Sequence, residues 1–177
     1  MERMRERLTA RVLLFDPQDR LLLMRGRLPD AAQGPDFWFT VGGGLEDGES
    51  LEAAALREAE EETGLTDLML GPVVWRDETI LRDAELTPRH FKQRYIVARS
   101  AGGPLSRAGW HAEEHALIDE LRWWTREEFA HSHETIYPIG LAELLVDVLA
   151  GRVAPEPLVI ATVDGPVLPI PRVEVAD

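Results

Sequence analysis

The sequence predicts an α+β fold, an α/β/α sandwich built on a central mixed β-sheet. Apolar segments with strand character lie both before and after one charged helical segment at residues 50–64. Strands on both sides of a helix can join one sheet in either direction, so the sheet should be mixed. A second helical pattern at residues 139–149 supplies a layer for the opposite face. The length of 177 residues fits one domain of this kind.

Composition excludes several classes of protein. The hydrophobic content is 45 % and the charged content 29 %, and no apolar run approaches the ~20 residues of a membrane span. Glu2 and Glu6 interrupt the basic N-terminus, so no signal peptide is predicted and a cytoplasmic location is expected. There is no cysteine, which excludes disulfides and thiolate ligands. The net charge of −13 argues against a partner with a long phosphate backbone, such as a long nucleic acid.

The first strands are predicted from apolar runs and turn residues. Residues 8–15 and 20–24 are apolar, and Asp16-Pro17-Gln18-Asp19 between them predicts a turn, so the two runs should form a hairpin. Arg25 and Arg27 follow the second run. They are either solvated side chains or contacts to a substrate phosphate.

A polar loop and a short apolar strand follow. Residues 28–36 are rich in Pro, Gly and Ala, which predicts a loop, and residues 37–41 predict a strand that leads into three glycines. Trp38 in this strand is either a core residue or a ring that stacks on a base.

The helix at residues 50–64 carries charges where a helix is normally apolar. Ser50 has the character of an N-cap, and Gly64 that of the residue that ends a helix. Between them Leu51, Ala54, Ala55 and Ala59 form one apolar stripe at about 100° per residue. Glu58 and Glu62 lie on the same stripe, and Glu61 flanks them. These acidic side chains are therefore predicted to face the core.

Carboxylates crowded near a core require a positive partner. At about 4 Å and an effective dielectric of about 20, two like charges repel by roughly 4 kcal/mol. Carboxylate oxygens without His or Cys ligands favour Mg²⁺, with Mn²⁺ as the alternative. The competing interpretation is a solvated acidic end of a helix.

The spacing around this helix resembles the Nudix box of the Nudix hydrolase (MutT-like) superfamily. Gly43 is followed by five residues and Glu49, then by seven residues and Arg57-Glu58-Ala59-Glu60-Glu61-Glu62-Thr63-Gly64-Leu65. Every fixed position of the box is matched, although Ala59 is small for its aliphatic position. The approach Trp38–Gly44 is similar to the family's W-x-x-P-G-G-G, with Val41 in place of proline.

The resemblance implies the Nudix fold and metal-dependent hydrolysis of a pyrophosphate bond by attack of water on phosphorus. It implies that Glu58, Glu62 and the Gly43 carbonyl hold the metal, with Glu61 as a further ligand or as the group that deprotonates water. Arg57 is expected to pair with Glu49 and so fix the glycine loop against the helix.

After the box, residues 67–75, 78–81 and 91–98 predict strands. The arginines of this region are candidate contacts to a phosphate or base: Arg76, Arg82, Arg89 and Arg94. Arg94 is the preferred candidate. Residues 110–120 are expected to be an acidic loop before a strand at 121–124, and Thr125 should cap a helical turn.

This acidic loop resembles the family loop that supplies one more glutamate, which binds metal or takes a proton from water. The candidates are Glu113, Glu114 and Glu120, with Glu114 preferred; an ordinary solvated acid is the alternative.

The C-terminal end divides into a helix and an extension. The helix at 139–149 has Leu141, Leu144, Leu145 and Val148 on one side. Residues 1–152 are expected to form the Nudix domain, and residues 153–177 a Pro/Val-rich extension. Asp164-Gly165 predicts a hairpin there, packed on the domain or at a homodimer interface.

The function predicted from the sequence is hydrolysis of a small nucleoside diphosphate derivative: a nucleoside triphosphate, an oxidised nucleotide or a nucleotide sugar. The alternative is a non-catalytic Nudix-like domain that senses nucleotides, although such domains typically lose glutamates of the box and here all are present. Substrate markers of some family branches are absent from residues 78–83. The sequence therefore leaves the nucleotide open.

Overall fold

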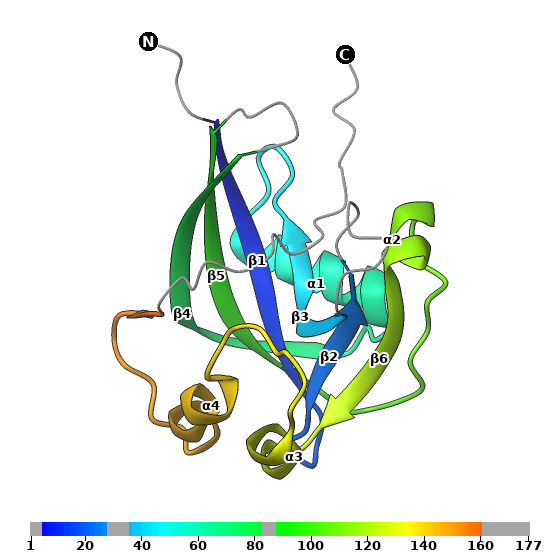
Figure 1. The fold of residues 1–177 in the computed structure, drawn as a ribbon, viewed down its shortest axis with the longest axis vertical. Coiled ribbons are helices and arrows are strands. Elements are labelled where there is room, and N and C mark those ends of the chain that lie inside the picture. The colour runs from blue at the N-terminus through cyan, green and yellow to red at the C-terminus, as the bar shows by residue number, and fades with distance from the viewer. Residues whose placement is uncertain (1–4, 28–35, 83–87, 161–177) are drawn as a thin grey trace.

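Seven strands and four helices make up the described part of the chain, which in this computed structural model covers residues 5–27, 36–82 and 88–160 (Figure 1). In chain order they are β1 (Arg5–Phe15), β2 (Leu21–Gly26), β3 (Phe37–Gly44), α1 (Leu51–Thr63), β4 (Leu68–Arg82), β5 (Pro88–Ser100), α2 (Ala112–Leu117), β6 (Ile118–Trp124), α3 (Arg126–His131), α4 (Leu141–Leu149) and β7 (Leu158–Val159).

All seven strands belong to one mixed sheet in the order β6-β2-β3-β1-β5-β4-β7. The β1–β5 and β4–β7 pairs are parallel, and the remaining neighbours are antiparallel. β1 lies at the centre because its whole length pairs with β5 on one edge while Thr9–Val12 pair with the end of β3 on the other. The predicted mixed sheet is confirmed.

The two faces of the sheet carry separate cores. Alternate residues of β1 point to opposite faces, as the period of a strand requires. Val12 and Leu14 pack with the alanines of α1, whereas Leu13 and Phe15 pack with Phe129 of α3 and Leu145 of α4. Figure 1 shows α1 on one side of the strands and α3 and α4 on the other. The predicted α/β/α sandwich is therefore confirmed.

The predicted N-terminal hairpin is wrong beyond its turn. The Asp16 carboxylate accepts hydrogen bonds from the N–H groups of Gln18 and Arg20, so the turn forms as expected. The two strands, however, pair only at Phe15 and Leu21. The physical reason is that β3 pairs with Thr9–Val12 on the edge that β2 would need, while β5 takes the other edge, so β2 lies between β3 and β6 instead.

The later elements differ from expectation in extent. The segments predicted at 67–75 and 78–81 are one strand, β4, whose pairing with β5 shifts register near Val73. Thr125 caps α3 as predicted: its hydroxyl accepts from the N–H of Glu128, and the Glu128 carboxylate accepts from the N–H of Thr125. The loop predicted at 28–36 lies almost wholly outside the described residues.

The described part of the C-terminal extension joins the sheet. β7 pairs with β4 at Trp75 and Arg76, and Ile160 is 6 % exposed in the core on the α4 face. Leu158 and Val159 thus pair with the edge of the sheet while their side chains stay exposed, and Ile160 is buried; packing of the whole extension on the domain stays a prediction. The Asp164-Gly165 hairpin signal lies outside the described residues, and a homodimer stays a prediction. In the described part of the chain, no helix is both long and apolar enough to cross a membrane.

The packing of α4 gives a first prediction. Leu145 is 1 % exposed, whereas its neighbour Val146 is 36 % exposed. Leu145→Ala should lower the free energy of unfolding by about 2–5 kcal/mol, because it leaves a cavity between α4 and the sheet. Val146→Ala should change it by about 0.5 kcal/mol or less. Urea unfolding followed by circular dichroism measures both, and equal effects of the two substitutions would contradict this account of the α4 layer.

Candidate active site

The helix α1 begins and ends at the residues that the sequence predicts. The Ser50 hydroxyl accepts a hydrogen bond from the N–H of Ala53 at 3.1 Å. Gly64 has φ of 74°, in the left-handed region, and its N–H donates to the Glu60 carbonyl at 2.8 Å. These caps fix the register of the helix, so its buried face carries two carboxylates among its alanines.

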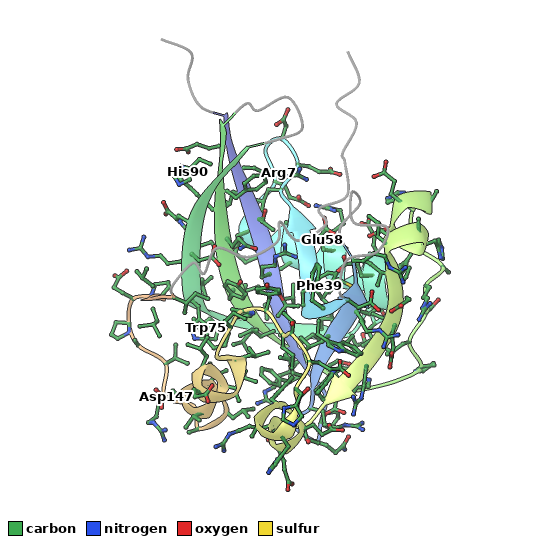
Figure 2. The ribbon with its side chains drawn as sticks, viewed as in Figure 1. Arg7, Phe39, Glu58, Trp75, His90 and Asp147 are labelled. Carbon is green, nitrogen blue, oxygen red and sulfur yellow. The ribbon has the colours of Figure 1, made fainter. Side chains whose placement is uncertain are left out.

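Glu58 lies where α1 crosses the end of β3 (Figure 2). Its carboxylate rests directly on the backbone of Gly43: a Cβ added to Gly43 would lie 2.4 Å from the Glu58 Cδ atom. Only a glycine leaves room for this approach. Glu58 is 6 % exposed, so the sheet and helix remove its carboxylate from water.

Glu62 lies one turn further along the same face and is 2 % exposed. Its Oε2 atom accepts a hydrogen bond from the N–H of Gly42 at 2.8 Å. Gly42 has φ of +131°, and a Cβ there would lie 2.0 Å from the Ala10 carbonyl oxygen. The conformation of β3 that offers this N–H group therefore requires glycine.

Glu114 is the third buried carboxylate of the cluster and comes from another element. It is 6 % exposed, and its Oε2 atom accepts from the N–H of His111 at 2.6 Å. The predicted acidic loop is wrong here, because its middle is the short helix α2, in which Glu114 occupies the capping-box position. Of the other two loop candidates, Glu113 is exposed and Glu120 pairs with Arg25 at 3.4 Å.

Burial and mutual repulsion set the electrostatics of the cluster. Burial raises the pKa of Glu62 well above its ordinary value of 4.5, and the negative charges of Glu58 and Glu114 raise it further. Burial likewise raises the pKa of Glu58, against the lowering effect of Arg57. The carboxylates are therefore close enough to oppose one another's ionisation.

Arg57 connects the glycine loop to the helix. Its Nε and Nη2 atoms bind the two carboxylate oxygens of Glu49 at 2.9 and 2.8 Å, and Nη2 also donates to the Gly44 carbonyl at 3.1 Å. Nη1 binds Glu58 at 2.8 Å and lies 3.5 Å from a carboxylate oxygen of Glu61. These bonds, the pair with Glu49 first, raise the pKa of Arg57, so its charge is permanent. The expected pair is present, and its role in orienting ligands stays a prediction.

The chemistry of this donor set fits a hard divalent cation. Glu58, Glu62 and Glu114 are buried and like-charged, Arg57 binds only Glu58 among them, and the chain has no cysteine. Among the described residues, however, no three acidic or histidine side chains already converge on one point. Glu61 has a side chain 43 % exposed and points to Arg57, so it has room to turn toward an ion.

Comparison with known proteins identifies the family. The NUDIX domain family matches residues 5–144. The chain belongs to the Nudix family. It is 32 % identical over 151 residues to an RNA pyrophosphohydrolase of Caulobacter vibrioides, covering 79 % of this chain and 83 % of that protein. The chain is thus a Nudix hydrolase, as predicted.

Two solved structures show the same fold. The MutT protein from Methanosarcina mazei Go1 superimposes with a TM-score of 0.59 at 18 % identity, covering 86 % of this chain and 99 % of that one. The NUDIX domain of Shewanella oneidensis NrtR, complexed with ADP ribose, gives a TM-score of 0.59 at 19 % identity, covering 84 % and 90 %.

Trp38 does not have the role of a stacking residue in this Nudix protein. It is 1 % exposed and packs edge-on against Trp124 in the core of the α4 face, and its indole N–H binds Glu134. A ring without an open face cannot stack on a base, so of the two roles predicted for Trp38 the structure supports the core residue and not the stacking ring.

The predicted arginines are divided between the two faces of the sheet. The Arg25 guanidinium lies 5.7 Å from the Trp38 ring centre, on the face opposite α1, and binds Asp119 at 2.9 Å. Arg27 also pairs with Asp119, at 3.4 Å. The structure therefore does not bring Arg25 to the carboxylates.

Arg94 is better placed than Arg25. It pairs in register with Ala10, which pairs with Gly43, so two strand spacings or about 10 Å separate Arg94 from Gly43. Ile96 and Ala98, which share its face of β5, pack in the core under α1. The Arg94 side chain is 23 % exposed and lies 3.4 Å from Glu78.

Sequence reasoning missed two aromatic residues on the α1 face of the sheet. Trp110 is buried, and its indole N–H donates to the Glu62 carbonyl at 2.8 Å, which holds the connection before α2 against α1. Tyr137 is half-buried beside Phe37, with 5.6 Å between the ring centres, on the α1 face. Neither lies in a periodic segment, so no pattern in the sequence indicated them.

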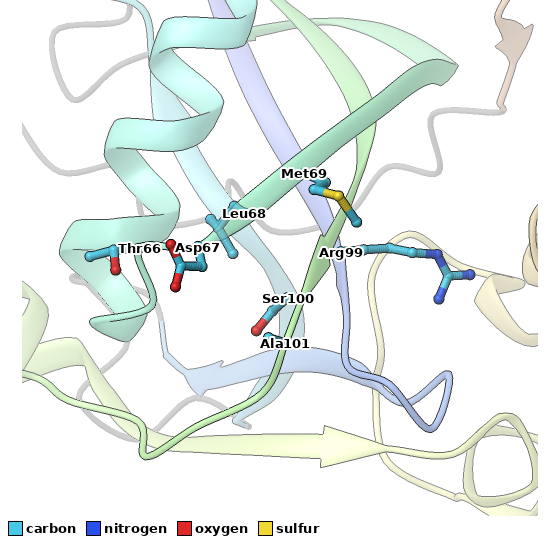
Figure 3. A pocket seen from close by; sticks show the side chains of 7 residues that line it. All are labelled: Thr66, Asp67, Leu68, Met69, Arg99, Ser100 and Ala101. Carbon is cyan, nitrogen blue, oxygen red and sulfur yellow. The ribbon is translucent and has the colours of Figure 1, made fainter.

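A pocket near the end of β5 is a separate feature. A pocket of about 430 Å³ lies between the start of β4 and the end of β5, and Figure 3 shows Met69 and Arg99 at its sides. Arg99 is five residues from Arg94 along β5, roughly 17 Å at the rise of a strand. None of the carboxylates of the cluster lines this pocket.

The raised pKa values predict how the stability of the metal-free protein depends on pH. A carboxyl group whose pKa is higher in the folded than in the unfolded state stabilises the fold below its unfolded pKa, and this contribution is lost as pH rises through the folded pKa. The Tm of metal-free protein should therefore fall as the pH rises above 4.5, the ordinary pKa of these groups. Differential scanning calorimetry of the wild type and Glu62→Gln tests this, since the variant should show a smaller fall; identical slopes would contradict it.

Proposed function

We propose that this Nudix hydrolase uses a divalent cation to cleave a pyrophosphate bond in a small nucleoside diphosphate derivative, such as a nucleoside triphosphate, an oxidised nucleotide or a nucleotide sugar. The observation that carries the proposal is the cluster of buried carboxylates Glu58, Glu62 and Glu114, in which Glu58 lies against the backbone of Gly43. Burying so much uncompensated charge is costly unless a positive ligand binds there.

The residues that would hold Mg²⁺ or Mn²⁺ are Glu58, Glu62, the carbonyl of Gly43, and Glu61 once it turns from Arg57. A bound cation would supply charge neutralisation at the phosphate oxygens and would lower the pKa of a water molecule. Arg57 fixes the glycine loop against α1 through Glu49 and the Gly44 carbonyl, so the donors stay in register.

Glu61 and Glu114 are the candidates for the group that orients and deprotonates the attacking water. Glu61 is the most exposed of the cluster, which gives it access to water. Glu114 is buried and already accepts the His111 N–H, so it is held in place. A general base must lie within hydrogen-bonding distance of the water molecule whose proton it takes. Both side chains lie beside the cluster, Glu61 on α1 and Glu114 on α2.

Substrate recognition is proposed for the α1 face. Arg94 offers a cation about two strand spacings from Gly43. Tyr137, rather than Trp38, offers a partly open aromatic ring on this face. Arg94 would pair with the negative charge of the phosphates, and Tyr137 would stack on the base of a nucleotide.

A second candidate substrate is the 5′-phosphorylated end of an RNA. The similarity to an RNA pyrophosphohydrolase at 32 % identity favours it. The net charge of −13 opposes extended contact with an RNA backbone, because such contact needs basic surface to release counterions. An RNA substrate is therefore compatible with this chain only if recognition is confined to the terminal phosphates and first base.

Charge-neutral substitutions test the carboxylate roles. Glu61→Gln and Glu62→Gln should each lower kcat by a factor of about 10² to 10⁴, because an amide neither carries the charge nor accepts a proton. Their circular dichroism spectra should match that of the wild type. Glu60→Gln is the control, since Glu60 is exposed on the other side of the helix. Turnover near the wild-type value in both variants would refute the assignment.

A substrate panel tests the reaction class. Nucleoside triphosphates, oxidised nucleotides, nucleotide sugars and a 5′-triphosphorylated RNA are incubated with Mg²⁺ or Mn²⁺, and the products are separated chromatographically. Release of a nucleoside monophosphate with pyrophosphate or a sugar phosphate is expected from at least one small nucleotide. Hydrolysis of the RNA alone would favour the second candidate. Binding without hydrolysis would contradict the proposal and favour a nucleotide-sensing domain.

A further inference from the structure

A fully buried arginine lies beneath the glycine loop, on the face of the sheet opposite α1. Arg11 of β1 is 1 % exposed within a run of apolar residues. Its Nη1 atom donates to the Gly42 carbonyl at 3.3 Å, and its Nε atom donates to the Gln93 side chain at 2.7 Å. In the proposed reaction scheme this side chain has no direct part.

Gly42 is the residue through which Arg11 reaches the carboxylate cluster. Its carbonyl accepts from Arg11, while its N–H donates to Glu62 at 2.8 Å. Gly42 has φ of +131°, a conformation that glycine adopts without penalty but that no side chain of its own fixes. Besides the pairing of β3 with β1, two side-chain contacts restrain the peptide groups of Gly42, one from Glu62 and one from Arg11.

The remaining contacts of Arg11 hold its guanidinium in place. Gln93 donates to both carboxylate oxygens of Asp77 at 3.0 and 3.1 Å, and the Tyr95 hydroxyl donates to Asp77 at 3.3 Å. Burial lowers the pKa of Arg11, while the negative charges of Glu62 and Asp77 raise it. The guanidinium is thus a buried cation that lies between Asp77 of β4 and the carboxylates Glu58 and Glu62 of α1.

Packing alone does not account for an arginine at this position. The neighbours of Arg11 on its own face of β1, Thr9 and Leu13, are uncharged and 0 % exposed. Replacing a buried charged network by apolar side chains of similar volume often leaves stability unchanged or improved. A buried cation that contacts the glycine loop is better explained by what it does to that loop.

We propose that Arg11 is a positioning residue for the hydrolytic site. It holds the Gly42–Gly43 peptide group from behind the sheet and so restrains the backbone on either side, namely the Gly42 N–H that binds Glu62 and the Gly43 carbonyl. The inference rests on the proposed function for its catalytic consequence, but the contact with Gly42 exists without metal or substrate. Arg11 acts through Gly42 and touches no reacting atom.

Arg11→Met tests the proposal, because methionine fills much of the volume without donating hydrogen bonds. In metal-free protein, hydrogen exchange at the Gly42 amide, followed by NMR, should become at least about tenfold faster than in the wild type, since Glu62 is no longer held. The dissociation constant for Mn²⁺, measured by electron paramagnetic resonance, should rise about tenfold. In the loaded enzyme kcat should fall more than KM rises.

Tyr95→Phe is the matched control. It removes a buried hydrogen bond at the far end of the same network and leaves the Arg11–Gly42 contact intact. It should lower Tm while leaving the Gly42 exchange rate and the Mn²⁺ dissociation constant at wild-type values. Arg11→Lys should recover part of the Mn²⁺ affinity, because an ammonium group can still donate to one acceptor.

Gln93→Met provides a second route if Arg11→Met does not fold. It frees the Arg11 Nε atom without removing the charge, and faster exchange at Gly42 is again expected. Wild-type exchange and Mn²⁺ affinity in either folded variant would overturn the proposal. If the wild-type protein showed neither Mn²⁺ binding nor turnover, the proposed function would fail, whereas the exchange rate at Gly42 would still decide the role of Arg11.

Discussion

The repulsion between buried carboxylates is the interaction on which this structure depends. Glu58 and Glu62 lie on the face of α1 that packs on the sheet, and Glu114 approaches them from α2. Three carboxylates that are buried close together repel one another strongly when they are ionised, because the dielectric constant of the protein interior is low. The surrounding structure can therefore be understood as the set of contacts that keeps them together.

Those contacts come from both sides of the sheet. On the α1 side, Arg57 binds Glu49, Glu58 and the Gly44 carbonyl, and so ties the helix to the loop. On the other side, Arg11 binds the Gly42 carbonyl. The glycines at 42 and 43 have no side chains, and this lets helix and strand approach closely. The pairing of β3 with β1 restrains the backbone of both glycines, and the two arginines add side-chain contacts that glycine cannot supply itself.

The parts that the sequence predicted well are those governed by local chemistry. The limits of α1 at Ser50 and Gly64 were predictable because the capping of a helix depends only on residues that are neighbours in the chain. Long-range pairing was harder to predict. The turn at Asp16 suggested a hairpin, but the partner of β1 is decided by strands distant in the chain. Glu114 was preferred among three acids, yet its place in a short helix depends on packing that no periodicity reports. Arg11 was overlooked because it lies within an apolar run.

The connection from β5 to α2 limits where this chain can change in length. The N–H of Ser106 donates to the Thr63 carbonyl, Trp110 binds the Glu62 carbonyl, and a Cβ on Gly109 would lie 2.5 Å from the Glu61 carbonyl oxygen. These contacts attach the connection to the last turn of α1 a few residues before Glu114. Extra residues can be accommodated upstream of Ser106, whereas a change in length downstream would carry Glu114 out of phase with the helix. Loop diversification in relatives of this chain is expected to concentrate on the upstream side.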